Sequence, residues 1–274
     1  MNRPRGLFCV AIDELILYNL DIMAKTRVVI LAAGKGKRMG VDVPKPLMPI
    51  SGKPMIAHLI ASVVASGVDA RPIVVVAPDC LELFKTTLGD VCDYAVQAEQ
   101  LGTGHAVLQA REAIDGADSV VVLYGDHPFI PASTLVELVT LHDKEPDSVA
   151  MLTSTVPDYE APYDAFVSWG RILRGSKGEV EDIREVKDCT DNEKEIREVN
   201  PALYAFPCAW LWQQLPKLDT ENASQEFYLT DVIPLAVAEG RPIVTAPADP
   251  LDVMGVNTID ELKRAEEVFE KKSV

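Results

Sequence analysis

Short apolar runs alternate along the first half of the chain with segments whose apolar residues recur at helical spacing. The runs are rich in β-branched residues and predict buried strands over 27–33, 73–77 and 119–126, with a shorter strand over 93–97. Helices are predicted between these strands, over 54–67, 81–89, 102–114 and 131–145. The alternation predicts a Rossmann-like, doubly wound α/β fold whose sheet is mixed but mostly parallel.

The second half of the chain follows a less regular pattern. We expect a strand over 148–156, a hairpin formed by 164–174 and 179–189, and a strand over 198–207. Helices are expected over 227–240 and 258–272, and Thr258 with Glu261 has the spacing of a capping box. No segment has the composition of a linker and no repeat occurs. A single domain with a small β-rich part is therefore expected.

The first residues differ from this pattern. The apolar stretch 7–22 is interrupted by Asp13, Glu14 and Asp21, and no small-residue cleavage site follows it. We interpret residues 1–23 as an extension outside the fold, with 24–274 as the domain. A short docking helix is the alternative interpretation, and Met23 is a candidate for the true start of the chain.

The charge balance excludes some partners. The 26 Lys and Arg residues against 42 Asp and Glu residues give a formal net charge of −16. Binding to nucleic acid or to an anionic membrane needs a basic surface, so neither partner is expected. No apolar run reaches the ~20 residues that span a bilayer. The first 53 residues nevertheless hold nine basic and four acidic residues, which favours a small polyanionic ligand bound near that end.

The cysteines and histidines indicate the compartment. Five cysteines form an odd number with no CxxC pair, which is not the pattern of a disulfide framework or a zinc site. The four histidines are scattered, so no cluster of protein ligands for a transition metal is visible. A reducing compartment, the cytoplasm, is predicted.

A glycine loop with a high density of positive charge follows the first predicted strand. Gly34 and Gly36 let backbone N–H groups approach phosphates, and Lys35, Lys37 and Arg38 add charge. The spacing is neither that of a Walker A loop nor that of a dinucleotide fingerprint. Lys45, between two prolines, is a further fixed positive charge. Taken alone, the loop is also compatible with an ordinary turn between a strand and a helix.

Two oxygen-bearing residues are candidates for a metal site. Asp126 ends a buried strand, and ligands of open α/β sheets collect at such carboxyl ends. Asn257 precedes the last predicted helix. Magnesium takes one or two protein oxygens together with phosphates and waters, so this pair suits Mg²⁺. Each residue alone is equally compatible with a role in a turn.

Several motifs together resemble one family. Bacterial N-acetylglucosamine-1-phosphate uridylyltransferases contain, in this order, segments similar to LAAGKGKRM, PKPLMPISGKPM, QAEQLGTGHAV, YGDHP, WGRI, REVKD, EVN, EFYLTD and GVN. The resemblance covers about residues 27–270. It implies Mg²⁺-dependent transfer of uridylyl from UTP to a sugar-1-phosphate with release of pyrophosphate. The family's acetyltransferase half, a β-helix of hexapeptide repeats, has no counterpart in this chain.

The resemblance also implies roles for individual residues. The uracil site would comprise Ala32, Ala33, Gly34, Gln97, Gly102 and Thr103. Arg38 would contact the triphosphate, Lys45 the phosphates at the reaction centre, and Asp126 with Asn257 the magnesium ion. Contacts to the sugar would come from Tyr124, Gly170, Glu185 and Asn200. A glutamine such as Gln97 offers one donor and one acceptor to a pyrimidine edge.

The chain departs from the family near the sugar. Pro201 and Ala202 stand where the family has a small polar residue and a glycine, and Lys37 stands where Thr is common. The acceptor therefore stays open between N-acetylglucosamine-1-phosphate, glucose-1-phosphate and another hexosamine phosphate. A cytidylyltransferase and a non-catalytic sugar-nucleotide sensor are the rival functions.

Overall fold

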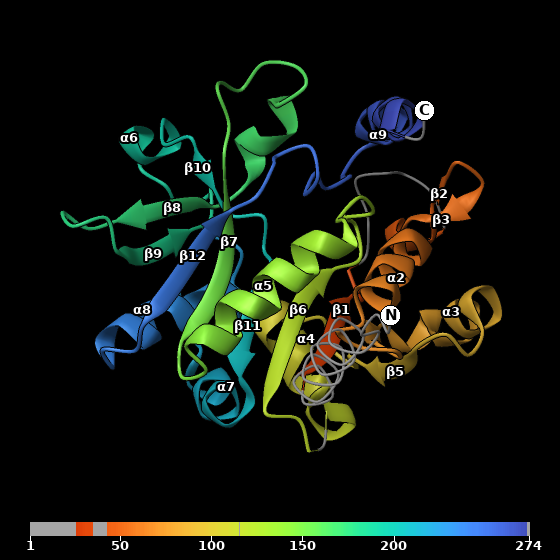
Figure 1. The fold of residues 1–274 in the computed structure, drawn as a ribbon, viewed down its shortest axis with the longest axis horizontal. Coiled ribbons are helices and arrows are strands. Elements are labelled where there is room, and N and C mark those ends of the chain that lie inside the picture. Colours follow the sequence, from red (N-terminus) through yellow and green to blue (C-terminus); the bar gives the residue numbers. More distant parts are fainter. Residues whose placement is uncertain (1–25, 35–42, 115, 273–274) are drawn as a thin grey trace, which may run out of the picture.

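The computed structural model describes residues 26–34, 43–114 and 116–272. A ten-stranded mixed sheet runs through this part of the chain, in the order β5–β4–β1–β6–β11–β7–β10–β8–β9, with β12 also paired to β7 (Figure 1). The strands are β1 (Thr26–Leu31), β4 (Ile73–Val76), β5 (Asp93–Val96), β6 (Ser119–Tyr124), β7 (Val149–Thr155), β8 (Arg171–Arg174), β9 (Val180–Arg184), β10 (Glu198–Val199), β11 (Tyr204–Pro207) and β12 (Ile243–Pro247).

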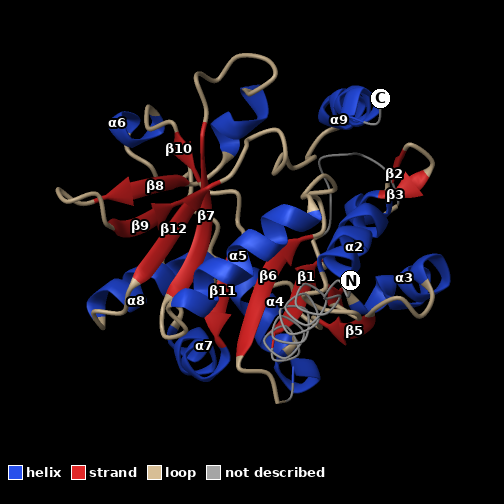
Figure 2. Cartoon of the chain, in the orientation of Figure 1, coloured by secondary structure: helices blue, strands red, loops and turns tan. Residues whose placement is uncertain are grey.

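Helices cover both faces of the sheet (Figure 2). They are α2 (Met55–Ser66), α3 (Leu81–Leu88), α4 (Thr103–Gln109), α5 (Ala132–Lys144), α6 (Asp191–Lys194), α7 (Cys208–Gln214), α8 (Val232–Ala238) and α9 (Ile259–Lys272). A small hairpin of β2 (Pro49–Ile50) and β3 (Lys53–Pro54) lies beside α9. The doubly wound α/β fold expected from the sequence is confirmed.

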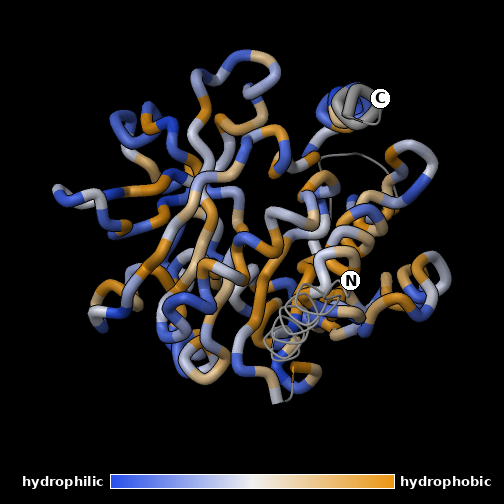
Figure 3. The backbone as a smooth tube through the Cα atoms, viewed as in Figure 1, coloured by the Kyte–Doolittle hydropathy of each residue, from blue (hydrophilic) through white to orange (hydrophobic). Residues whose placement is uncertain are grey.

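The strand sequences explain the two-layered core. Successive residues of a strand point to opposite faces, and nearly every position of β1 is buried. Val29 packs into the cluster formed with α4, α7 and α8, whereas Val28 packs into the cluster formed with α2, α3 and α5. Figure 3 shows the central strands as largely hydrophobic along their length. A run without polar alternation is what a strand covered on both faces requires.

Parallel and antiparallel pairing divide the sheet. The strands β5, β4, β1 and β6 are parallel to one another, so their carboxyl ends meet at one edge. From β6 onward, β11 pairs antiparallel with both β6 and β7, and β8 and β9 form an antiparallel hairpin. The change of direction beside β6 places the second half of the chain next to the carboxyl edge of the first half.

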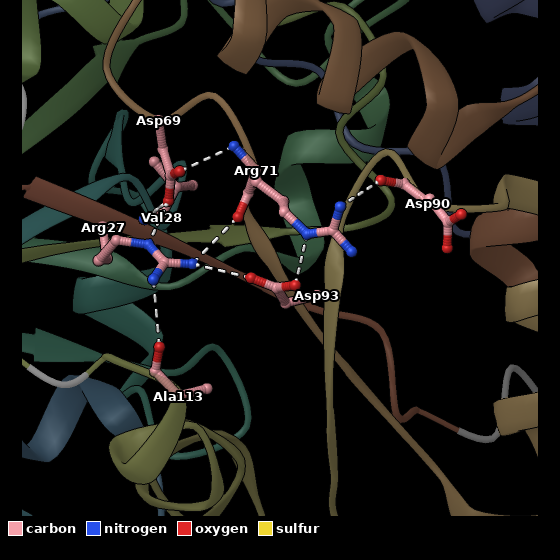
Figure 4. Close-up of polar contacts among 7 residues, drawn as sticks. All are labelled: Arg27, Val28, Asp69, Arg71, Asp90, Asp93 and Ala113. Carbon is pink, nitrogen blue, oxygen red and sulfur yellow. Dashed lines mark hydrogen bonds and ion pairs between the residues drawn. The ribbon is translucent and has the colours of Figure 1, made fainter.

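Ion pairs occupy the opposite edge of the parallel strands (Figure 4). At the start of β1, the Arg27 guanidinium donates to Asp69 at 2.9 Å and to Asp93 at 3.3 Å. Arg71 donates to the other Asp93 oxygen at 2.5 Å, and Asp69 also accepts from the Val28 N–H. These contacts tie the loop after α2 to the beginnings of β1 and β5, so the carboxyl edge is the one left for a ligand.

Several boundaries differ from those expected. The segment 164–174 was expected to be extended, but its first part is a 3-10 helix, Asp164–Ser168, and only Arg171–Arg174 is a strand. The cause is Arg171, whose fully buried guanidinium donates to the carbonyls of Phe166, Val167 and Trp169. A buried arginine needs several acceptors, and the coiled backbone supplies them.

The expected strand over 198–207 is interrupted. It forms β10 and β11, separated by a turn in which Ala202 has φ 57. Pro201 has no N–H to donate to a ladder, and the Ala202 N–H donates to the Asn200 side chain at 3.0 Å. The interruption therefore begins at the residue expected to bind the sugar.

Three other elements were misjudged at their ends or missed. The expected helix 227–240 starts later, because the Phe227 N–H donates to the Leu101 carbonyl in an extended segment at 2.8 Å. The strand β12 was missed because it is short and only partly buried. The helix α7 was missed because it follows β11 directly, without a polar break in the sequence.

The expected capping box at the last helix forms in part. The Thr258 hydroxyl accepts from the Glu261 N–H at 3.1 Å, as the spacing predicts. The Glu261 carboxylate accepts from the Asn257 N–H at 2.5 Å, one residue earlier than the motif requires. The helix start thus fixes the backbone of Asn257, a candidate metal ligand. Across the described part of the chain, no helix is long and apolar enough to cross a membrane.

Candidate active site

A cavity of about 580 Å³ lies at the carboxyl edge of β1 and β6. Most of the residues that the sequence singled out for a nucleotide line it, although they come from five separate segments of the chain. The lining residues are Leu31, Ala32, Ala33, Gly34, Lys45, Pro46, Gln97, Gln100, Gly102, Thr103, Ala106, Tyr124, Asp126, Glu226 and Asn257. Its volume is in the range of small-molecule sites.

One cationic group joins the two candidate metal ligands. The Lys45 ammonium donates to the Asp126 carboxylate in a short contact and to the Asn257 side-chain oxygen at 2.9 Å. Lys45 lies in a 3-10 helix, Lys45–Leu47, whose flanking prolines restrict the backbone. Residues separated by more than 200 positions are thereby brought to one point.

Backbone hydrogen bonds hold this cluster in place. The Gly125 N–H donates to the Leu31 carbonyl at 2.9 Å, which carries the β1–β6 pairing to the end of both strands. The Val256 N–H donates to the Asp126 carbonyl at 2.9 Å, so the loop before α9 is attached directly to the end of β6. The relative position of Asp126 and Asn257 is therefore set by main-chain contacts.

The electrostatics favour an ionised Asp126. Burial alone would raise the pKa of its carboxyl, but the Lys45 ammonium beside it holds that pKa below its ordinary value. Burial lowers the pKa of the His127 imidazole, which therefore stays neutral beside the Trp169 ring. Asp126 thus carries a permanent negative charge, as a ligand of a cation should.

The expected uracil residues lie together on the far side of the cavity. Gln97 follows β5 directly and is buried, and its amide nitrogen donates to the Gly102 carbonyl at 3.0 Å. Gly102 has φ 120, and a Cβ there would lie 2.5 Å from the Phe227 carbonyl oxygen, so only glycine fits. The Thr103 hydroxyl accepts from the Leu229 N–H at 2.9 Å. The EFYLTD segment thereby fixes the start of α4.

The expected sugar residues form a second group beside β6. The Asn200 N–H donates to the Gly170 carbonyl at 2.9 Å, and the Asn200 side-chain oxygen accepts from the Tyr204 hydroxyl at 2.8 Å. A Cβ on Gly170 would lie 3.4 Å from a carboxylate oxygen of Glu185. These residues adjoin Tyr124, which lines the main cavity.

The Glu185 carboxyl belongs to a distinct hollow of about 400 Å³. Burial, together with the Asp188 and Asp231 carboxylates, raises its pKa to about 7. Burial likewise raises the pKa of Asp231 to about 6, with Asp219 the next contributor. This hollow is therefore acidic, and at neutral pH the Glu185 carboxyl is close to half-protonation.

Some of the expected residues are not described by the structure, and two residues that were not expected line the cavity. Arg38 and Lys37, together with residues 1–23, lie outside the described residues. Gln100 and Glu226 line the cavity although sequence reasoning gave them no role. The Gln100 side-chain oxygen is buried without a hydrogen-bond partner among the described residues, which suggests a donor on a ligand. Gln100 lies in the motif QAEQLGTGHAV and Glu226 in EFYLTD, so the motifs could have indicated both residues as part of the site.

The donor set at Asp126 suits magnesium. Two oxygens of Asp126 and Asn257 already converge on one cation, the Lys45 ammonium. Hard oxygen donors are what Mg²⁺ prefers, and it completes its coordination with phosphates and water. No cluster of three or more His, Cys, Asp or Glu side chains that could hold a metal is found among the residues the structure describes. Any resident metal would therefore need further ligands from substrate.

This fold, with a ligand cavity at the carboxyl edge of its parallel strands, is that of nucleotidyltransferases. A solved structure of CMP:2-keto-3-deoxy-manno-octonic acid synthetase complexed with CTP superposes with a TM-score of 0.67 over 90% of this chain and 99% of that one. Its sequence identity is 20%, so this likeness concerns the fold.

The chain belongs to the family of MobA-like NTP transferase domains, whose model matches residues 28–228. It is 41% identical over 248 residues to the bifunctional protein GlmU of Stutzerimonas stutzeri, covering 90% of this chain and 52% of that protein. The GlmU protein of Brevibacillus brevis is 37% identical over 252 residues, with 91% and 53% covered. The chain spans about half the length of these curated relatives.

Proposed function

We propose that this protein transfers uridylyl from UTP to N-acetylglucosamine-1-phosphate, with magnesium, and releases pyrophosphate. The observation that carries the proposal is the cluster in which the Lys45 ammonium contacts both Asp126 and Asn257 at the mouth of the cavity. The relatives of 37–41% identity support the choice of reaction. The residues expected to bind the uracil line the same cavity, which also supports it.

The reaction follows from the charges of its partners. An oxygen of the sugar phosphate attacks the α-phosphorus of UTP in line, and the bond from that phosphorus to the pyrophosphate oxygen breaks. Both reactants are anions, so the protein must align them and offset their repulsion. The sugar phosphate is already a nucleophile, so no general base is needed and the neutral His127 has no proton to accept.

Lys45 supplies a positive charge to the reacting phosphates in this proposal. Its stem is held between two prolines, and the ammonium needs only to turn from Asp126 toward the α-phosphate. Arg38, from the glycine loop, would hold the remaining phosphates through its planar guanidinium. A magnesium ion held by Asp126 and Asn257 would neutralise phosphate charge. The metal and the lysine would then both offset negative charge on the reacting phosphates.

The sugar would lie between Tyr124 and the Gly170–Glu185–Asn200 group. The Asn200 oxygen is already used by the Ala202 N–H and the Tyr204 hydroxyl, so Asn200 offers its amide nitrogen as a donor. Glu185 offers carboxylate oxygens as acceptors for sugar hydroxyls. The turn at Pro201–Ala202 adjoins Asn200, because the Ala202 N–H donates to the Asn200 side chain. Since this turn departs from the family's pattern, another sugar-1-phosphate, such as glucose-1-phosphate, is the alternative acceptor.

A substrate panel tests the proposal. Pyrophosphate release is measured with each of UTP, CTP, dTTP and GTP against N-acetylglucosamine-1-phosphate, glucosamine-1-phosphate and glucose-1-phosphate, with and without Mg²⁺. The proposal requires the highest kcat/KM for UTP with N-acetylglucosamine-1-phosphate and no release without a divalent cation. Preference for CTP would indicate a cytidylyltransferase. Binding of nucleotide without release from any pair would indicate a sensor.

A further inference from the structure

The amide nitrogen of Gln97 is fully occupied within the protein. It donates to the Gly102 carbonyl at 3.0 Å and lies 3.1 Å from Nδ1 of His105. A primary amide nitrogen has two N–H bonds, so these two contacts use both. Gln97 is 3% exposed, and its side-chain oxygen is the only polar atom it has left for the cavity. The expectation that Gln97 offers a donor and an acceptor to a base is therefore replaced by an acceptor alone.

The orientation of this amide depends on His105, a residue with no assigned role. The Gly102 carbonyl only accepts, and it favours the nitrogen of Gln97 on its side. The imidazole Nδ1 adds the second restraint, because a rotated amide would face it with oxygen, and two acceptors would then meet. His105 is the third residue of α4 and is partly buried.

The contact of the second ring nitrogen, Nε2, is compatible with Nδ1 as the acceptor. Nε2 of His105 lies 3.1 Å from the side-chain amide nitrogen of Gln109, one turn further along α4. A neutral imidazole has one N–H and one acceptor nitrogen, so it accepts from only one of two neighbours. Gln97 is held by Gly102, whereas Gln109 can rotate its amide and present oxygen to Nε2–H. Nδ1 is thus the acceptor and Nε2 carries the proton.

We propose that His105 is a positioning residue that fixes the Gln97 amide with its oxygen toward the nucleobase. The inference rests on the proposed use of a nucleoside triphosphate in this cavity and deepens it. A fixed acceptor selects a base with an N–H donor at the facing position. The uracil ring has one such donor, N3–H, whereas N3 of cytosine is itself an acceptor and would meet the Gln97 oxygen unfavourably.

Paired variants separate this role from a structural one. His105→Leu removes the acceptor, whereas His105→Asn keeps an oxygen in the place of Nδ1 and should restore the effect. In the full chain, kcat/KM is measured with UTP and with CTP in the pyrophosphate-release assay. We expect His105→Leu to lower the UTP-to-CTP ratio by at least ~10-fold, since an unpaired polar contact costs about that much. His105→Asn should keep the ratio near that of the wild type.

A modified nucleotide tests the polarity without any substitution. N3-methyl-UTP lacks the N3–H but keeps both carbonyl oxygens. The wild-type protein should use it at least ~10-fold less well than UTP, and His105→Leu should discriminate less. Equal use of UTP and N3-methyl-UTP by the wild type would overturn the inference even if His105→Leu does not fold.

The remaining outcomes are also decisive. Gln109→Leu removes the outer contact of His105 and should leave the UTP-to-CTP ratio unchanged. An unchanged ratio in His105→Leu, or an equal loss in His105→Leu and His105→Asn, would overturn the positioning role. If the wild type releases no pyrophosphate with UTP, the proposed function fails first. A selective wild type with insensitive His105 variants contradicts the inference alone.

Discussion

The main cavity and the hollow beside Glu185 differ in how their carboxyl groups are paired. In the nucleotide half, residues 26–144, the carboxylate of Asp126 is paired with the Lys45 ammonium, and its pKa is lowered. In the sugar half, residues 149–247, Glu185 and Asp231 adjoin other carboxylates, and burial raises both pKa values. The carboxylate of the cavity is therefore paired with a cation of the protein, whereas the two carboxyl groups of the hollow lie among other carboxylates.

This difference suggests different tasks. A compensated carboxylate keeps its charge and its position, which suits a group that must hold a cation near phosphates. Desolvated carboxyl groups without strong donors gain most when a ligand supplies hydrogen bonds, which suits recognition of sugar hydroxyls. Of the four predictions that follow, Asp126→Asn and Glu185→Gln test this contrast, and Gly102→Ala and Ala202→Gly test the backbone that supports each half.

The largest effect is expected from Asp126→Asn. The substitution keeps the shape of the side chain but removes the charge that would hold the metal. We expect kcat to fall by about 100- to 1000-fold, the usual cost of one electrostatic group at a reaction centre. KM for UTP should change much less, since Gln97 and Gly102 are untouched. Steady-state pyrophosphate release over a range of Mg²⁺ concentrations measures both parameters.

The exposed Asp79→Asn is the matched control for the loss of one charge. Its kcat should equal that of the wild type. Wild-type turnover of Asp126→Asn at saturating Mg²⁺ would contradict the assignment of Asp126 as a metal ligand.

The next effect concerns the start of α4. In Gly102→Ala the new Cβ would lie 2.5 Å from the Phe227 carbonyl oxygen, at a φ of 120 that L residues avoid. We expect the free energy of unfolding to fall by about 3 kcal/mol from strain and overpacking together. Urea denaturation measures this change. Gly89→Ala, at φ 64 with open space around it, should cost only about 1 kcal/mol. Equal costs would show that the contact with Phe227 is unimportant.

In the sugar half, Glu185→Gln should change how stability depends on pH. The folded pKa is about 7 against a usual 4.5, so between these values the unfolded chain loses a proton that the folded chain keeps. Wild-type stability is therefore lowered progressively as pH rises from about 4.5 to 7, by up to ~3 kcal/mol, and the penalty then stays constant. Glutamine has no such penalty.

Denaturation curves from pH 5 to 8 measure this difference. The two proteins should be nearly equal in stability at the acid end, and Glu185→Gln should be the more stable at pH 8. The exposed Glu137→Gln serves as the matched control for the loss of one glutamate. Parallel curves for the wild type and Glu185→Gln would contradict the raised pKa.

The smallest effect is expected from Ala202→Gly. Ala202 has φ 57, where an L residue is strained by about 1 kcal/mol, and glycine relieves this at some cost in unfolded-state entropy. We expect a gain of up to ~1 kcal/mol in the free energy of unfolding. Ala57→Gly, inside α2, should instead lose about 1 kcal/mol. A loss of similar size in both variants would show that the turn at Ala202 is not strained.

Much of the nucleotide half could be predicted from the sequence because its signals are local. Each strand of the parallel sheet is one apolar run, and the cavity residues follow directly at the ends of those runs. Ala32 and Gly34 follow β1, Gln97 follows β5 and Asp126 follows β6. The topology alone then brings them to one edge.

The sugar half was predicted less well because its structure depends on long-range contacts. The buried Arg171 converts part of an expected strand into a 3-10 helix, and nothing in its local sequence marks it as buried. The pairing of β12 with β7 joins segments about 90 residues apart. The orientation of the Gln97 amide likewise depends on His105, a neighbour that residue types alone do not reveal.

The central claim is that Asp126 and Asn257 hold a divalent cation beside the phosphates while Lys45 is released to the substrate. A crystal structure of the full chain with Mn²⁺ and a non-hydrolysable UTP analogue tests this most directly, because manganese is located by its anomalous scattering. The account predicts a manganese peak bonded to oxygens of both residues, with the Lys45 ammonium on a phosphate. Manganese bound elsewhere, with the Lys45–Asp126 contact intact, would contradict it.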